Sequence, residues 1–171
     1  MLKNIAILFG ITMLPAFELR ASIPVGILEG RLDLPFGMAL EGMGLSPPFV
    51  FIVCVISNII LGIFLYPFID VIMHLLERIP VIGRFWTSFV MRAQRRIHPY
   101  VEKWGAVGVA LFVAIPLPGS GSYTGSVGAY MLGMSYRRFI LANALGVILA
   151  GIAVTVITLT GAKLFSIFAA M

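Results

Sequence analysis

Residues 49–69 read FVFIVCVISNIILGIFLYPFI and contain no charged side chain. A hydrocarbon core of about 30 Å takes about 20 apolar residues of helix to cross, because each residue adds roughly 1.5 Å along the helix axis. Residues 139–162, FILANALGVILAGIAVTVITLTGA, are also uncharged and long enough. The sequence therefore predicts two transmembrane helices, which set the class of the fold.

The composition of the whole chain agrees with a membrane protein. The 171 residues are 60% hydrophobic and 11% charged, with a mean hydropathy of +1.06. Soluble domains carry about 25% charged residues, so a soluble fold is excluded. We expect a single membrane domain over residues 1–171. Cys54 is the only cysteine, so we expect no disulfide and no cysteine-based metal site. We also expect no cofactor.

Two further apolar regions are broken near their centres. The first, at residues 4–28, is interrupted by Pro15, Glu18, Arg20 and Pro24, and the second, at 105–136, by IPLPGSG at 115–121. The arm at 105–115 spans only about half of the bilayer, so we expect a helix, a break and a return, which is a re-entrant hairpin. Non-helical backbone at that depth must be buried in protein or face a watery cavity. The hairpins therefore indicate a functional cavity.

The two halves of the chain share an order of features. The matching pairs are Leu14-Pro15 with Ile115-Pro116, Ser57-Asn58 with Ala142-Asn143, and Gly62 with Gly146. This order predicts an all-α integral membrane fold of two repeats, at about 1–72 and 104–171, each a re-entrant hairpin followed by a transmembrane helix. A longer loop around 29–46 absorbs the difference in spacing. The alternative is that the shared order is a coincidence.

Basic residues orient this arrangement. The linker at about 73–103 carries Arg78, Arg84, Arg92, Arg95, Arg96 and Lys103, and Arg137 and Arg138 fall on the same side. The opposite side holds only Lys3, Arg31 and Lys163. By the positive-inside rule the linker is cytoplasmic and both termini face outward. The repeats are then inverted in a multi-pass protein of the plasma or inner membrane.

The linker itself has an amphipathic pattern. Its aromatic and aliphatic residues recur at helical spacing, at Phe85, Trp86, Phe89, Val90, Ala93 and Ile97. Such a basic amphipathic helix is typical of a segment lying on anionic membrane lipids. Nucleic-acid binding is not expected, because the sequence contains no recognition module.

Glu18 and Arg20 are the charged pair in the first hairpin. Charges at depth in a membrane are costly unless paired or hydrated, which makes them functional candidates. In an extended break both side chains project to one side and address one cavity, with Glu18 as a proton carrier and Arg20 as a permanent charge. Ser22, followed by Pro24, is a candidate cap for the returning helix. The alternative is that Glu18 and Arg20 cap a loop in water.

The second hairpin is rich in backbone-breaking and hydroxyl residues. Pro116, Pro118, Gly119 and Gly121 break the backbone, while Ser120, Ser122, Tyr123 and Thr124 supply hydroxyls. Ser122 is a candidate cap of the returning helix, and two helix starts near mid-membrane favour an anion. The alternative is a glycine-rich packing site formed by Gly121, Gly125, Gly128 and Gly133.

The segments ELRASIPVG at 18–26 and IPLPGSGSYTG at 115–125 resemble the small multidrug export protein family over nearly the whole chain. The arrangement is also similar to the broader DedA superfamily. The resemblance implies two hairpins that meet in the membrane and a transport role, with a lipid-linked phosphate carrier as the DedA substrate. DedA members usually place an arginine in the second hairpin, whereas residues 115–136 here carry no charge.

These features favour a secondary transporter with alternating access, coupling protons at Glu18 to an amphipathic or lipid-like substrate. ATP-driven pumping is not supported, because no glycine-rich phosphate loop with a following lysine is present. The alternatives are a passive lipid scramblase or accessory scaffold, and an integral-membrane enzyme. An enzyme has less support, because no histidine or second acid lies near the hydroxyl-rich hairpin. Small-residue helix faces favour a homodimer.

Overall fold

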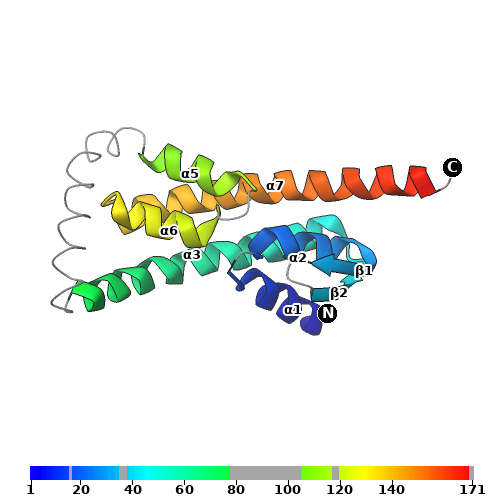
Figure 1. Cartoon of the computed structure of the whole chain (residues 1–171), viewed down its shortest axis with the longest axis horizontal. Helices are drawn as coiled ribbons and strands as arrows, with labels where there is room; N and C mark the ends of the chain where they lie inside the picture. The colour runs from blue at the N-terminus through cyan, green and yellow to red at the C-terminus, as the bar shows by residue number, and fades with distance from the viewer. Residues whose placement is uncertain (16, 35–37, 78–104, 117–119, 170–171) are drawn as a thin grey trace. The chain divides into compact units, whose positions relative to one another are not determined.

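The computed structural model describes residues 1–15, 17–34, 38–77, 105–116 and 120–169 (Figure 1). The chain is mostly helical and its elements are α1 (Leu2–Thr12), α2 (Glu18–Ile27), β1 (Glu29–Leu34), β2 (Met38–Met43), α3 (Pro47–Glu77), α5 (Ala106–Ala114), α6 (Ser122–Met131) and α7 (Tyr136–Ala169). They form two compact units, one of Met1–Asn58 with Ile148–Met171 and one of Ile59–Val147.

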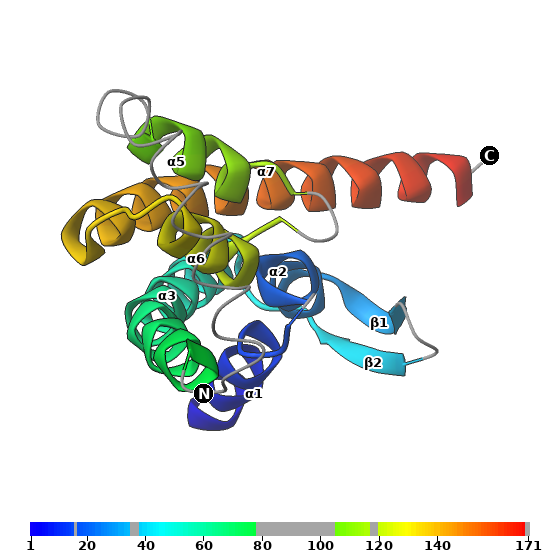
Figure 2. The ribbon, with the colours of Figure 1, turned by 60° about the vertical axis from the view of Figure 1, so that its left-hand side comes forward.

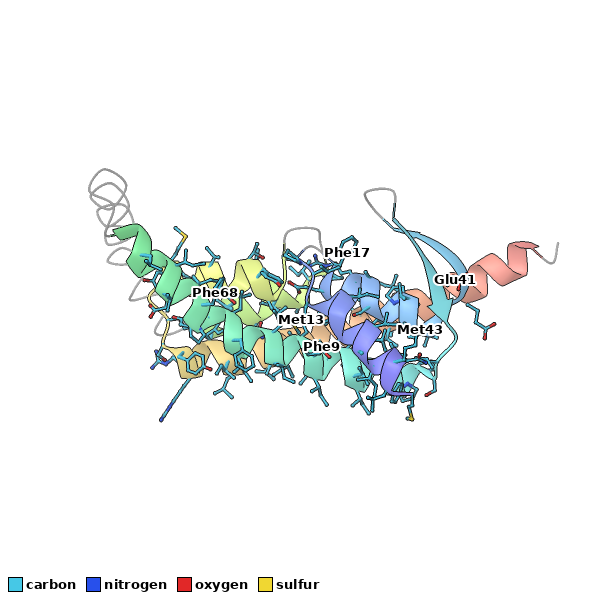
Figure 3. All side chains as sticks on the ribbon, turned by 90° about the horizontal axis from the view of Figure 1, so that it is seen from below. Phe9, Met13, Phe17, Glu41, Met43 and Phe68 are labelled. Carbon is cyan, nitrogen blue, oxygen red and sulfur yellow. The ribbon has the colours of Figure 1, made fainter. Side chains whose placement is uncertain are left out.

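The two predicted transmembrane segments lie in the long helices α3 and α7. Within the described residues, the stretches Pro47–Ile72 and Tyr136–Gly161, each of 26 residues, are long and apolar enough to cross a membrane. Large apolar side chains stay exposed along both helices, among them Ile52, Ile56, Phe64, Phe68, Leu141, Leu145, Leu149 and Ile152. Figure 3 shows Phe68 on this apolar surface of α3. Exposed apolar surface of this extent suits contact with lipid.

The first unit is built on the helical pair α1 and α2, which lie side by side in both ribbon views (Figures 1 and 2). Its core contains Ile11, Phe17, Ala21 and Val25, with Met43 of β2 packed against them. Gly26 of α2 lies against α3, where an added Cβ would come within 2.5 Å of Val50 Cγ1. The first hairpin is thus held tightly to the start of α3.

We predict that Gly26→Ala destabilises the protein by about 1 to 3 kcal/mol, the usual cost of overpacking a core. The matched control is Gly10→Ala in α1, where an added Cβ meets nothing within 4 Å and alanine favours the helix. Thermal unfolding in detergent measures both. Equal melting temperatures for Gly26→Ala and the wild type would contradict the close packing of α2 on α3.

The prediction of an all-α fold is wrong at residues 29–34 and 38–43. These two segments form an antiparallel two-stranded ribbon, in which Glu29 pairs with Met43 and Leu34 with Met38 (Figure 2). The sequence alternates between charged and apolar residues in RLDL at 31–34, which is the pattern of a strand. A two-stranded ribbon is marginal by itself, and here it contacts α2 through both strands.

The second unit combines α5 and α6 with the second part of α3 and the first part of α7. Gly146 of α7 lies against α5, where an added Cβ would approach the Ala110 carbonyl oxygen at 2.6 Å and Val113 Cβ at 2.7 Å. Leu65 and Ile69 of α3 form a buried cluster that packs against three residues of α6, Tyr123, Val127 and Tyr130. Glycine thus brings α5 and α7 close together, and apolar packing joins α3 to α6.

The predicted linker is described only at its start. α3 continues to Glu77, so residues 73–77 are helical. The amphipathic helix predicted between residues 84 and 97, and the six basic residues assigned to the linker, lie outside the described residues.

Candidate functional site

The first break is shorter than the sequence suggested. α1 ends at Thr12 and α2 already begins at Glu18, so Glu18 and Arg20 lie in the first turn of a helix. The prediction that both lie in extended backbone is wrong. Glu18 has a φ of +42°, which is uncommon for a residue with a side chain and costs about 1 to 3 kcal/mol. This strained residue places a carboxylate at the start of α2, where the helix dipole favours negative charge.

The Glu18 carboxylate is buried and bonded to the neighbouring span. Its residue is 5% exposed, and Asn58 of α3 is 1% exposed. The Asn58 Nδ2 atom donates a hydrogen bond of 3.3 Å to Glu18 Oε2. This bond links residues 40 positions apart and ties the broken hairpin to the middle of a transmembrane helix.

Arg20 supplies the positive charge near this carboxylate. It is half-buried and interacts electrostatically with Glu18. Buried charged groups in proteins are paired or hydrogen-bonded, and here an amide donor and a guanidinium both interact with the carboxylate. The burial of Glu18 disagrees with the alternative in which it caps a loop in water. A binding role for Glu18 and Arg20 stays a prediction.

Ser22 and Pro24 both lie inside α2, so the prediction that they start the returning helix is wrong. The Ser22 hydroxyl is fully buried and donates a hydrogen bond of 2.9 Å to the Glu18 carbonyl. The Ser22 and Thr12 hydroxyls also lie within hydrogen-bonding reach of the Cys54 thiol. Through this hydrogen bond to the Glu18 carbonyl, Ser22 helps to fix the first turn of α2.

The second break separates α5, which ends at Ala114, from α6, which begins at Ser122. Gly121 precedes α6 with a φ of +121°, a conformation that favours glycine. No side chain caps α6, so the prediction of Ser122 as a cap is wrong. Ser122 is instead the first helical residue, and the Ser126 hydroxyl donates to its carbonyl at 2.5 Å.

The other residues predicted for this hairpin have separate positions. Ser120 donates a hydrogen bond to the Ile115 carbonyl across the break. Tyr123 packs against the α3 cluster. Pro116 lies at the end of the described arm, whereas Pro118 and Gly119 lie outside the described residues.

Asn58 and Asn143 are markers of the predicted repeat and are not among the predicted site residues. Each is almost fully buried in a span, and a polar side chain in a charge-free span is the signal that would have identified them. Asn143 of α7 meets Gly62 of α3, where an added Cβ would lie 2.9 Å from Asn143 Cγ. Among the described residues, Asn143 Oδ1 has no hydrogen-bond partner.

Aromatic rings gather one turn away from this contact. The Tyr66 ring stacks on Phe139 with centroids 4.8 Å apart, and Tyr130 and Tyr136 lie at 6.3 Å and 5.9 Å from Tyr66. The Tyr66 hydroxyl donates to the Met134 carbonyl. These rings join α3, α6 and the start of α7. Within the described part of the chain, no three His, Cys, Asp or Glu residues are placed to hold a metal ion.

Comparison with known proteins gives a family. A family model described as "Putative small multi-drug export protein" matches residues 18–153, from the first residue of α2 into α7. No curated protein and no solved structure matches the chain. The matched region contains Glu18, Arg20, Asn58 and Asn143 and covers well over half of the sequence. The chain therefore belongs to the small multi-drug export protein family, a membrane protein family whose description indicates export.

Proposed function

We propose that this protein is a small secondary transporter that exchanges protons, carried by Glu18, for an amphipathic substrate. The observation that carries the proposal is the buried Glu18 carboxylate, bonded to Asn58 of a transmembrane helix and paired electrostatically with Arg20. Ionisable residues at membrane depth mark ion and substrate pathways. The family description supports export as the direction.

The surroundings of Glu18 suit both of its protonation states. When Glu18 is ionised, Asn58 Nδ2 donates to it and Arg20 offsets its charge. When Glu18 is protonated it becomes a donor, and an amide can accept through its own oxygen after rotating. Arg20 is then released to hold an anion or water. A change of protonation at Glu18 thus changes the local charge, which is what coupling to substrate movement needs.

The two hairpins support an inverted-repeat architecture. α2 and α6 both have 10 residues. Each of the four buried residues of α6 has a buried counterpart at the same position of α2, pairing Ser122 with Glu18, Gly125 with Ala21, Ser126 with Ser22 and Ala129 with Val25, and α2 buries three further residues. In both helices the serine hydroxyl bonds the carbonyl of the first residue. We therefore propose that both are returning arms of re-entrant hairpins, the first with a charged start and the second with a neutral start.

We predict that a cysteine placed at Gln94 is not labelled by an impermeant maleimide in intact cells, because the basic linker is cytoplasmic. The matched control is a cysteine at Glu41, an exposed residue of β2 (Figure 3). The proposed topology places this residue on the outward side. The native Cys54 is fully buried and gives little background. Labelling at position 94 without labelling at position 41 would show that the true topology is the inverse of the proposed one.

The proposed function is tested by uptake into proteoliposomes that are acidic inside. Ethidium is a suitable probe, because its charge is permanent and its own deprotonation cannot drive its uptake. The membrane potential is held at zero with equal potassium on both sides and valinomycin. We expect ethidium to accumulate inside above its external concentration, and to stop doing so when the pH difference is removed.

The same vesicles separate transport from passive lipid movement. A scramblase equilibrates fluorescent phospholipid between the leaflets without regard to the pH difference. Ethidium that only equilibrates, together with rapid lipid equilibration, would contradict the proposal and favour the scramblase alternative.

A further inference from the structure

Asn143 is a polar residue placed deep in the second unit. Its side chain is 2% exposed, and its Oδ1 atom accepts no hydrogen bond from any residue that the structure describes. A buried acceptor without a donor costs stability, and folded proteins contain few of them. Such an atom is suited to receive a donor that comes from outside the chain.

The neighbouring helix leaves room for this amide. Gly62 of α3 faces Asn143 so closely that a Cβ there would overlap the amide nitrogen. The amide nitrogen of Asn143 therefore lies toward Gly62, and Oδ1 is the atom left for a ligand. One turn further along the two helices, Tyr66 and Phe139 stack on each other. The amide thus lies one helical turn along α7 from a residue of the aromatic cluster.

The chemistry around Asn143 favours a donor over an anion. In the first unit, Asn58 donates a hydrogen bond to the acidic residue Glu18 at the start of α2. In the second unit, the residue at the start of α6 is the neutral Ser122. Residues 105–136 contain no charge, so this hairpin offers no cation to bind a phosphate. The orphan atom is an acceptor, and aromatic rings attract cations rather than anions.

We infer that Asn143 binds an N–H donor of the transported cationic amphiphile, with Oδ1 accepting the hydrogen bond. This inference rests on the proposed transport function and names its substrate class. The substrate is an amphipathic cation that carries at least one N–H donor, a class that includes dodecylammonium and, through its aromatic amino groups, ethidium, and that excludes lipid phosphates.

The test is equilibrium binding of radiolabelled dodecylammonium to the protein in phosphatidylcholine nanodiscs, with empty nanodiscs subtracted. Dodecyltrimethylammonium, a cation without an N–H donor, and dodecyl phosphate serve as competitors. We expect the wild type to bind dodecylammonium and both competitors to compete poorly. Asn143→Leu, which keeps the shape but removes the acceptor, should bind at least roughly tenfold more weakly, the usual effect of losing a hydrogen bond to a charged group.

Two further variants sharpen the result. Asn143→Asp keeps an acceptor oxygen, so it should retain binding. If Asn143→Leu does not fold, the binding of Asn143→Asp still tests the inference. Thr155→Val is the matched control, because Thr155 of the same helix also has a buried hydroxyl without a partner among the described residues. It should bind like the wild type.

Unchanged binding by Asn143→Leu, or lost binding by Asn143→Asp, would overturn the inference. Stronger competition by dodecyl phosphate than by unlabelled dodecylammonium would overturn the substrate class. The assay needs no proton gradient and no transport, so its failure is distinct from failure of the proposed function. Ethidium accumulation can succeed where dodecylammonium binding fails, and the reverse also holds.

Discussion

Glu18→Gln is expected to abolish proton-driven accumulation of ethidium. Glutamine keeps the size of the side chain and a hydrogen-bonding oxygen for Asn58, but it cannot take up or release a proton. Accumulation should therefore fall at least tenfold, roughly to the level of empty liposomes, because a coupled transporter without its proton carrier has no driving force. Passive exchange of ethidium between equal concentrations can survive. Uptake with and without a pH difference separates the two activities.

The matched control for this change is Glu41→Gln. Glu41 lies on the exposed ribbon, so it loses the same charge without touching the buried site. Its uptake should match the wild type, since surface substitutions usually change stability by about 0.5 kcal/mol or less. Full accumulation by Glu18→Gln at normal protein levels would remove Glu18 from the coupling mechanism.

Arg20→Gln is expected to destabilise the protein and to stop transport. Removing one partner of a fully buried ion pair costs about 3 to 5 kcal/mol, and the cost here is smaller because Arg20 is only half-buried. Thermal unfolding in detergent measures the loss of stability.

Two comparisons isolate the pair. Lys3→Gln removes an exposed positive charge and should leave the melting temperature unchanged. The double variant Glu18→Gln with Arg20→Gln should be more stable than Arg20→Gln alone, because the buried carboxylate is gone as well. If the double variant loses as much stability as the two single variants together, the two charges do not interact.

The spans and breaks of this fold can be read from the sequence. Charge-free runs at 49–69 and 139–162 are long enough to cross a bilayer, and the candidate spans Pro47–Ile72 and Tyr136–Gly161 differ from these runs by at most three residues at either end. Pro15 and Pro116 mark the places where α1 and α5 have ended. These features depend on local composition and on the residues that helices exclude, so a single sequence contains them.

A long-range contact and one local backbone geometry could not be predicted from the sequence. The bond between Asn58 and Glu18 joins distant positions, and no local pattern specifies it. The positive φ of Glu18 lets α2 start earlier than the prolines suggest, with Pro24 inside the helix. The strand pattern in residues 31–34 was visible, but the prediction treated the segment as a spacer between helices.

The central claim is that substrate movement and proton movement are coupled at Glu18. The most direct test starts from an ethidium gradient across proteoliposomes with no initial pH difference, with a pH-sensitive dye inside and the membrane potential held at zero. The account predicts that the wild type changes the internal pH as ethidium moves, while Glu18→Gln and empty liposomes do not. Ethidium crossing through the wild type with no change in internal pH would contradict it.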